Sequence, residues 1–179
     1  MLFALSFGSI AGETISATVK NENTGEFTLS YPKGWKAIER HHINFATTFY
    51  RLVPPEKNFD FEMMINDKNT MRLGKLVDKD MERYIKFNLA GPAQQSVEKE
   101  VNPKRFGVRM DGVYALITDP NPKPGEYKYW VQGLRLIGND VVLFNLYSND
   151  KEIKNQILPV VDSVMFKKSN KRLWRQPLS

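Results

Sequence analysis

The chain has 179 residues, of which 41% are hydrophobic, and its 26 Lys and Arg against 20 Asp and Glu give a net charge of +6. This length is typical of one domain with its own core. The chain has no cysteine, which excludes disulfides, thiolate metal sites, iron–sulfur clusters and a cysteine nucleophile. Five basic and no acidic residues lie in residues 167–179. Because the remainder is almost neutral, the charge pattern argues against a nucleic-acid partner.

The first eleven residues are apolar and uncharged, and polar sequence follows them. Ser9 and Ala11 place small residues where a signal peptidase would cut. We therefore expect residues 1–11 to be the remnant of a signal peptide and the protein to be exported, to the periplasm or outside the cell. The alternative is a buried first strand or helix. Eleven residues are too few to span a bilayer, which takes about 20.

Strands are predicted in the first third of the chain. Residues 15–19 and 26–31 alternate apolar and polar side chains around an Asn-Thr-Gly turn, which is typical of a β-hairpin. Residues 43–53 are rich in aromatic and β-branched side chains and predict a third strand. Residues 59–65 alternate again and predict its partner.

The hydrophobic period then changes. Between residues 73 and 89 apolar side chains recur every three or four positions, which predicts an amphipathic helix that ends at Gly91-Pro92. Strands follow in the second half of the chain. We expect them at residues 97–101, 106–110, 113–118, 127–137 and 141–147.

The strand predicted at residues 141–147 is apolar on both faces and must therefore be covered on both. A second helix is predicted to supply one cover. It would start at a capping box over residues 149–152 and be kinked or broken at Pro159. Residues 164–166 would close the sheet as a short strand. The order is strands, helix, strands, helix around one antiparallel sheet.

Residues 27–35 read FTLSYPKGW. This run resembles the opening strand and turn of the PsbP-like proteins, which comprise an extrinsic subunit of photosystem II and its bacterial relatives. The resemblance implies an α+β fold, an α/β/α sandwich whose central antiparallel sheet has helices on both faces. It implies a single domain over residues 12–167, with a fold shared with Ran-binding import factors and exported bacterial domains. Such relatives act mostly as accessory or binding proteins.

Candidate chemistry is sparse. His41 and His42 are adjacent, so on a strand they point to opposite faces and would need Asp60 or Glu62 to complete a metal site. An exposed polar turn is the alternative for the two histidines. No nucleophile elbow, phosphate loop or dinucleotide fingerprint is present. We therefore expect no cofactor and no enzymatic activity.

Two segments are predicted to contact a partner. Three prolines stiffen the loop at residues 119–125, and we expect Pro122, Lys123 and Pro124 to touch a protein. The basic tail at residues 168–179 offers Lys171, Arg172 and Trp174 to an acidic protein patch or to anionic lipid headgroups. The alternatives are an ordinary surface connection for the first segment and a frayed, soluble terminus for the second.

The sequence thus predicts an exported, non-catalytic accessory protein that works through protein–protein contact. The alternatives are a small-ligand or metal-binding module and a hydrolase.

Overall fold

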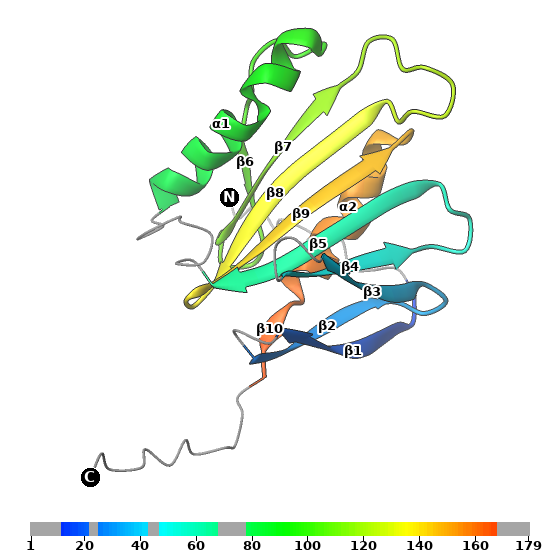
Figure 1. Ribbon diagram of the computed structural model, residues 1–179, viewed down its shortest axis with the longest axis vertical. Helices are drawn as coiled ribbons and strands as arrows, with labels where there is room; N and C mark the ends of the chain where they lie inside the picture. The colour runs from blue at the N-terminus through cyan, green and yellow to red at the C-terminus, as the bar shows by residue number, and fades with distance from the viewer. Residues whose placement is uncertain (1–11, 22–24, 43–46, 68–77, 168–179) are drawn as a thin grey trace, which may run out of the picture.

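The computed structural model describes residues 12–21, 25–42, 47–67 and 78–167, which form two antiparallel sheets and two α-helices (Figure 1). The larger sheet has seven strands in the order β3-β4-β5-β9-β8-β7-β6. Their bounds are β3 Lys36–His42, β4 Thr47–Val53, β5 Phe59–Asp67, β6 Lys104–Phe106, β7 Gly112–Thr118, β8 Tyr129–Ile137 and β9 Asp140–Ser148.

Strand β9 lies at the centre of the large sheet, between β5 and β8. Val142, Phe144 and Leu146 are buried in the core on one face, and Val141 and Leu143 in the core on the other. The prediction of a strand covered on both faces is confirmed. The predicted antiparallel sheet is confirmed with it.

The smaller sheet contains β1 (Thr14–Asn21), β2 (Gly25–Pro32) and β10 (Met165–Phe166), in the order β1-β2-β10. Phe27 and Leu29 of β2 are buried in the same core as Phe61 of β5. The predicted hairpin is confirmed, but the short strand near the C-terminus pairs with this hairpin instead of closing the large sheet. The expectation of a single sheet is wrong, because the hairpin packs across the large sheet instead of joining its edge.

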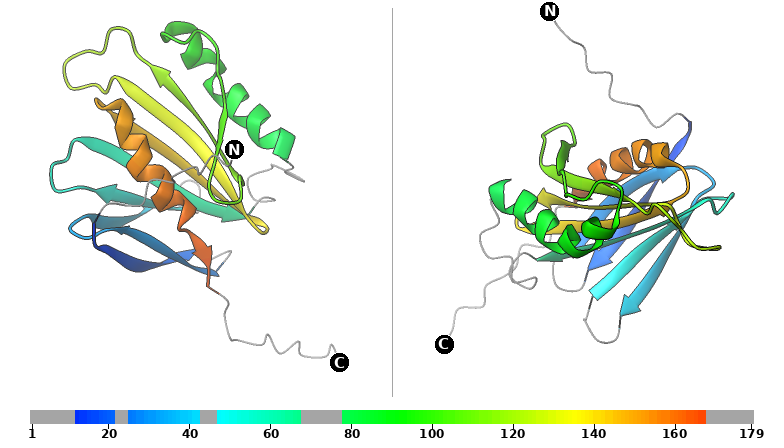
Figure 2. Two further views of the ribbon diagram at one scale, coloured as in Figure 1. Left: turned by 180° about the vertical axis from the view of Figure 1, so that it is seen from behind. Right: turned by 90° about the horizontal axis from the view of Figure 1, so that it is seen from above.

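Helix α1 (Asp78–Gln95) lies on one face of the large sheet, and α2 (Lys154–Asp162), preceded by a short 3₁₀ turn η1 (Lys151–Ile153), lies on the other (Figure 2). Met81, Ile85 and Leu89 of α1 are fully buried, as the helical period predicts. The fold is dominated by its sheets. The two helices cover the faces only in part, since the small sheet shares the face of α2.

Several elements differ from the sequence prediction. Helix α1 does not end at Gly91-Pro92 but continues to Gln95, where buried Ala93 packs its last turn onto the sheet. Pro159 does not break α2, and Asp150 caps η1 in place of the capping box expected from residue 149. Residues 97–101 form no strand. Instead the Val97 amide donates to the Thr118 carbonyl at 2.9 Å.

The C-terminal end of α2 is held by a buried arginine. Arg135 of β8 is 8% exposed, and its Nη1 donates to the carbonyls of Val161, Asp162 and Val164 at 3.2, 2.6 and 3.0 Å. Its Nε donates to Asp111 Oδ1 at 3.0 Å, and Nη2 lies 3.4 Å from Asp162 Oδ1. The guanidinium therefore supplies hydrogen bonds to carbonyls at the end of the helix, where the helical pattern of donors stops.

Within the described part of the chain, no helix combines the length and apolar character needed to traverse a bilayer.

Candidate functional site

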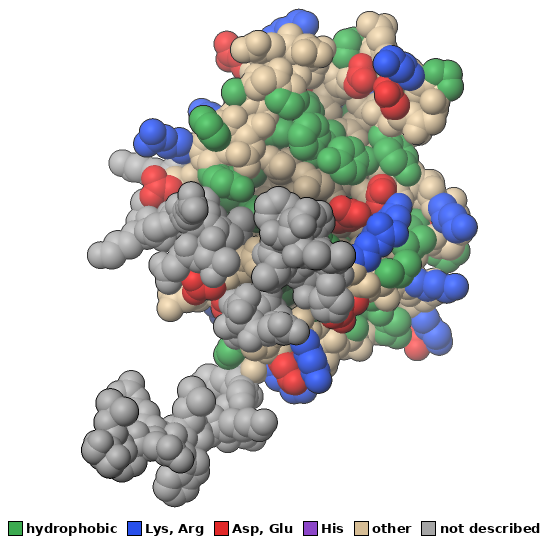
Figure 3. Space-filling model, in the orientation of Figure 1, with side chains coloured by type: hydrophobic (Ala, Val, Ile, Leu, Met, Phe, Trp, Pro, Cys, Tyr) green, Lys and Arg blue, Asp and Glu red, His purple; other side chains and the backbone are tan. Residues whose placement is uncertain are grey.

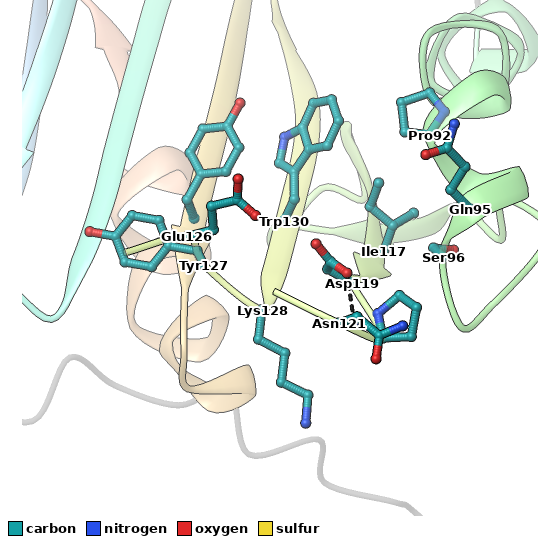
Figure 4. A pocket seen from close by; sticks show the side chains of 12 residues that line it. Pro92, Gln95, Ser96, Ile117, Asp119, Asn121, Glu126, Tyr127, Lys128 and Trp130 are labelled. Carbon is teal, nitrogen blue, oxygen red and sulfur yellow. Dashed lines mark hydrogen bonds between the residues drawn. The ribbon is translucent and has the colours of Figure 1, made fainter. Parts of the chain in front are cut away.

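A pocket of about 640 Å³ opens on the face of the large sheet that carries α1 (Figure 4). It lies between the C-terminal end of α1, the loop that joins β7 to β8, and the ends of β8 and β9. The pocket exists because α1 packs on β7 and β8 and leaves these strand ends uncovered. The lining residues are Pro92, Gln95, Ser96, Ile117, Asp119, Pro120, Asn121, Glu126, Tyr127, Lys128, Trp130 and Tyr147.

Three aromatic rings form one wall of this pocket. Trp130 of β8 and Tyr147 of β9 are register partners, and their rings lie near-parallel at 5.6 Å between centroids. Tyr127 continues the row, 6.5 Å from Tyr147. The Trp130 indole Nε1 donates to Asn145 Oδ1 at 3.1 Å, which fixes its orientation. Because these rings are only half-buried, they retain apolar surface that a ligand could cover.

Two carboxylates flank the aromatic row, and both are tied to the loop. Asp119 Oδ1 accepts from the Asn121 amide at 2.8 Å, and Glu126 Oε2 accepts from the Lys123 amide at 3.1 Å. The Asp119 amide donates to the Lys128 carbonyl at 2.8 Å, which closes the base of the loop. The loop is therefore held by its own hydrogen bonds.

The predicted contact residues Pro122, Lys123 and Pro124 lie at the exposed tip of this loop. They do not line the pocket, which is built by the residues on either side of them. The structure thus places the predicted loop at the rim of the site. The tail residues Lys171, Arg172 and Trp174, like the apolar residues 1–11, lie outside the described residues.

Acidic groups continue from the pocket along β5. Tyr147 pairs in register with Asp60, and Asn145 with Glu62. Burial raises the pKa of the Tyr147 hydroxyl, and the nearby carboxylates of Glu62 and Asp60 raise that pKa further. In Figure 3 acidic and basic side chains adjoin a hydrophobic area on this face. The basic partner of Asp60 is Arg51, whose Nε and Nη2 bind its two oxygens at 2.7 and 2.8 Å.

The predicted metal residues are not brought together. His41 and His42 lie at the C-terminal end of β3. Their neighbour Arg40 pairs with Phe49 of β4, which in turn pairs with Met64 of β5. Asp60 lies near the opposite end of β5 and is already paired with Arg51. No group of three or more potential metal ligands exists among the described residues. The side chains of the two histidines themselves lie outside what the structure describes.

Catalytic groups are also scarce in the pocket. Ser96 is the one serine among the lining residues, and its hydroxyl donates to the Ala93 carbonyl at 2.9 Å. No histidine is found in that lining, so the part of the chain that the structure describes assembles no Ser-His-acid set there.

Sequence reasoning missed Trp130, Tyr147 and Asn145 as site residues. Alternation within the predicted strands does place Trp130 and Gln132 on one face of β8, and Asn145 and Tyr147 on one face of β9. This row of polar and aromatic side chains on two adjacent strands could have indicated a binding surface. Only the register of the strands shows that the two rows meet.

No family model matches this sequence, and no curated protein matches it. Among solved structures, the fold is similar to the solution structure of cyanobacterial PsbP (CyanoP) from Synechocystis sp. PCC 6803. The TM-score is 0.53, the match covers 91% of this chain and 99% of that chain, and the sequence identity is 10%. At this identity the likeness shows the fold alone. The PsbP-like fold predicted from residues 27–35 is thereby confirmed.

Proposed function

We propose that this protein is a non-catalytic accessory protein that binds a partner protein at the aromatic pocket and its loop. The observation that carries the proposal is the open pocket walled by the near-parallel rings of Trp130, Tyr147 and Tyr127. Aromatic side chains are enriched at the energetic centres of protein interfaces. The PsbP-like fold supports the proposal, since the resemblance of residues 27–35 implies an accessory role.

The loop beside the pocket adds a second contact. Its tip carries Pro122, Lys123 and Pro124, all exposed, on a base closed by backbone hydrogen bonds. A stiff loop loses little conformational entropy when a partner binds. We therefore place the partner across the pocket and the loop tip together. Export and a contact made by the basic tail stay predictions from the sequence.

Site-specific photocrosslinking tests this proposal in cells that make the protein. A photoreactive phenylalanine at Lys123 or Tyr127 is expected to capture one discrete partner. The matched control is Val108, which is 75% exposed in the turn before β7, at the opposite end of that strand. The capture is expected to disappear when Trp130→Ala is added.

Equal capture from Val108, or capture that survives Trp130→Ala, would contradict the proposal. Because Trp130→Ala removes a half-buried ring, its fold is checked by circular dichroism. Tyr127→Ala, in the loop, serves as the second variant.

A further inference from the structure

The charge of the pocket is opposite to that of the chain. The chain carries a net charge of +6, yet the charged residues that line the pocket are Asp119, Glu126 and Lys128. The Lys128 ammonium lies 5.6 Å from the ring centroid of Tyr129, and Figure 4 shows its side chain extending away from Trp130 and Asp119. The charged lining therefore has two carboxylates and one ammonium, and the ammonium points away from the aromatic wall. Glu62, half-buried next to Tyr147 along β5, has the same sign as the two carboxylates.

The two carboxylates that line the site also keep hydrogen-bond acceptor capacity that the loop does not use. Asp119 and Glu126 each use one oxygen within the loop, and among the described residues no donor reaches the other oxygen of either. A ligand suited to this surface brings positive charge and several donors.

We infer that the partner presents an arginine side chain to this pocket, stacked against the rings of Trp130 and Tyr147 and paired with Asp119 and Glu126. The inference rests on the proposed function and names the chemistry of its partner. A guanidinium is planar, stacks on aromatic rings and carries five donors in a fork that fits carboxylates.

Other ligand classes match the site less well. Lysine brings a compact, strongly hydrated charge that stacks poorly on a ring. An apolar or proline-rich segment would cover the rings but leave the carboxylates partly desolvated and unpaired, which is unfavourable. A sugar supplies donors and stacks on aromatic rings, yet it neutralises no charge. Among these ligands, arginine alone can stack on the rings, neutralise the carboxylates and donate hydrogen bonds to their unused oxygens.

Peptide titration of the full chain tests the inference. The probes are three capped pentapeptides, Gly-Ser-X-Ser-Gly, in which X is arginine, lysine or the uncharged isostere citrulline. The readout is the indole N–H resonance of Trp130 in an NMR spectrum of labelled protein, assigned by its loss in Trp130→Phe. The arginine peptide is expected to shift this resonance with a dissociation constant in the millimolar range. The lysine peptide is expected to bind at least about threefold more weakly, and citrulline more weakly still.

Isosteric variants test the roles of the carboxylates. Asp119→Asn with Glu126→Gln is expected to weaken binding of the arginine peptide at least about threefold. Glu56→Gln, at an exposed turn residue, is the matched control and should change nothing. Raising the salt concentration to about 1 M, where the Debye length is about 3 Å, should weaken binding in the wild type.

Equal binding of the citrulline peptide, an unmoved Trp130 resonance up to about 10 mM arginine peptide, or no effect of the double variant would each overturn the inference. The proposed function and the arginine inference are tested by different experiments, so either can fail without the other. If photocrosslinking captures a partner at the pocket while the arginine peptide does not bind, the partner site stands and its arginine chemistry is wrong.

Discussion

The two faces of the central sheet treat their polar groups in opposite ways. On the face of α2, Arg135 is buried and donates to three carbonyls and to Asp111, and it lies beside Asp162. On the face of α1, the carboxylates of Asp119 and Glu126 stand exposed beside half-buried rings. The first arrangement is closed, because its charges and carbonyls are matched within the chain. The second leaves acceptors and aromatic surface for another molecule. Polar groups on the two faces of one sheet can therefore stabilise the fold on one side and stay available to another molecule on the other.

The largest effect on stability is expected at Arg135, on the face that carries α2. Arg135→Met removes the cation beside Asp111 and Asp162 and one donor from each of three carbonyls, so the free energy of unfolding should fall by about 3–5 kcal/mol. Urea denaturation followed by circular dichroism measures it. Arg135→Lys is the matched control, and it should recover only part of the loss because one ammonium cannot reach every acceptor. A loss below about 1 kcal/mol would mean that Arg135 does not hold the end of α2.

On the face that carries the pocket, a substitution should affect partner binding much more than it affects the stability of the fold. Trp130→Ala removes a half-buried ring from a near-parallel pair, so it should cost about 1–2 kcal/mol of folding free energy while abolishing capture of the partner. Trp35→Ala is the matched control. That ring packs edge-on against Phe59 at 5.2 Å in the core on the other face of the sheet, and its loss should lower stability with capture intact. If both variants lose capture, the loss reflects lower stability and not a contact of Trp130 with the partner.

Glu98 differs from Asp119 and Glu126, because both of its carboxylate oxygens accept hydrogen bonds from Thr118. Burial raises its pKa, but hydrogen bonds from the Thr118 hydroxyl and amide, at 2.6 and 2.7 Å, outweigh burial, and the net pKa is lowered below 4.5. The stability it contributes is therefore present above pH 4.5 and is lost as the pH falls through the lower, folded-state pKa.

Glu98→Gln should accordingly destabilise the protein at neutral pH, and the gap to wild type should close in acid. Urea denaturation at several pH values measures that gap. Glu100→Gln, an exposed neighbour, should show no such pH dependence. A gap that stays constant down to about pH 2 would contradict the lowered pKa.

The smallest effect is expected at the loop tip. Pro122→Ala and Pro124→Ala loosen an exposed loop, so together they should change the free energy of unfolding by no more than about 1 kcal/mol. Capture of the partner should weaken by about threefold, because the loop must then be ordered on binding. Pro55→Ala, an exposed proline between β4 and β5, is the control. Unchanged capture by the loop variants would confine the contact to the pocket.

The elements whose patterns are strong were predictable from sequence. The double apolar row of β9 and the helical period of Met81, Ile85 and Leu89 reflect burial directly, and the structure confirms both. Strand β3 was missed because five of its seven residues are charged or histidine. Charged side chains at a sheet edge hinder pairing with other chains, so they conceal the strand from a hydrophobicity pattern.

The pocket could be predicted only in part. Its loop was identifiable from the prolines, since their stiffness is a local property. Its aromatic wall was not, because Trp130 and Tyr147 come together only through the register of β8 and β9. Pro92 and Gln95 reach the rim because α1 extends past the glycine and proline that were expected to end it. That extension depends on tertiary packing of Ala93, which local propensity does not contain.

The pairing of β10 with β2 has a consequence for the order of assembly. Thr28 aligns with Met165, so nearly all of the described chain is synthesised between the two strands that meet there. During translation the hairpin of β1 and β2 emerges early, and its third strand arrives only after the large sheet has left the ribosome. An isolated two-stranded hairpin is marginally stable in water. The small sheet should therefore become ordered late, after the large sheet has folded.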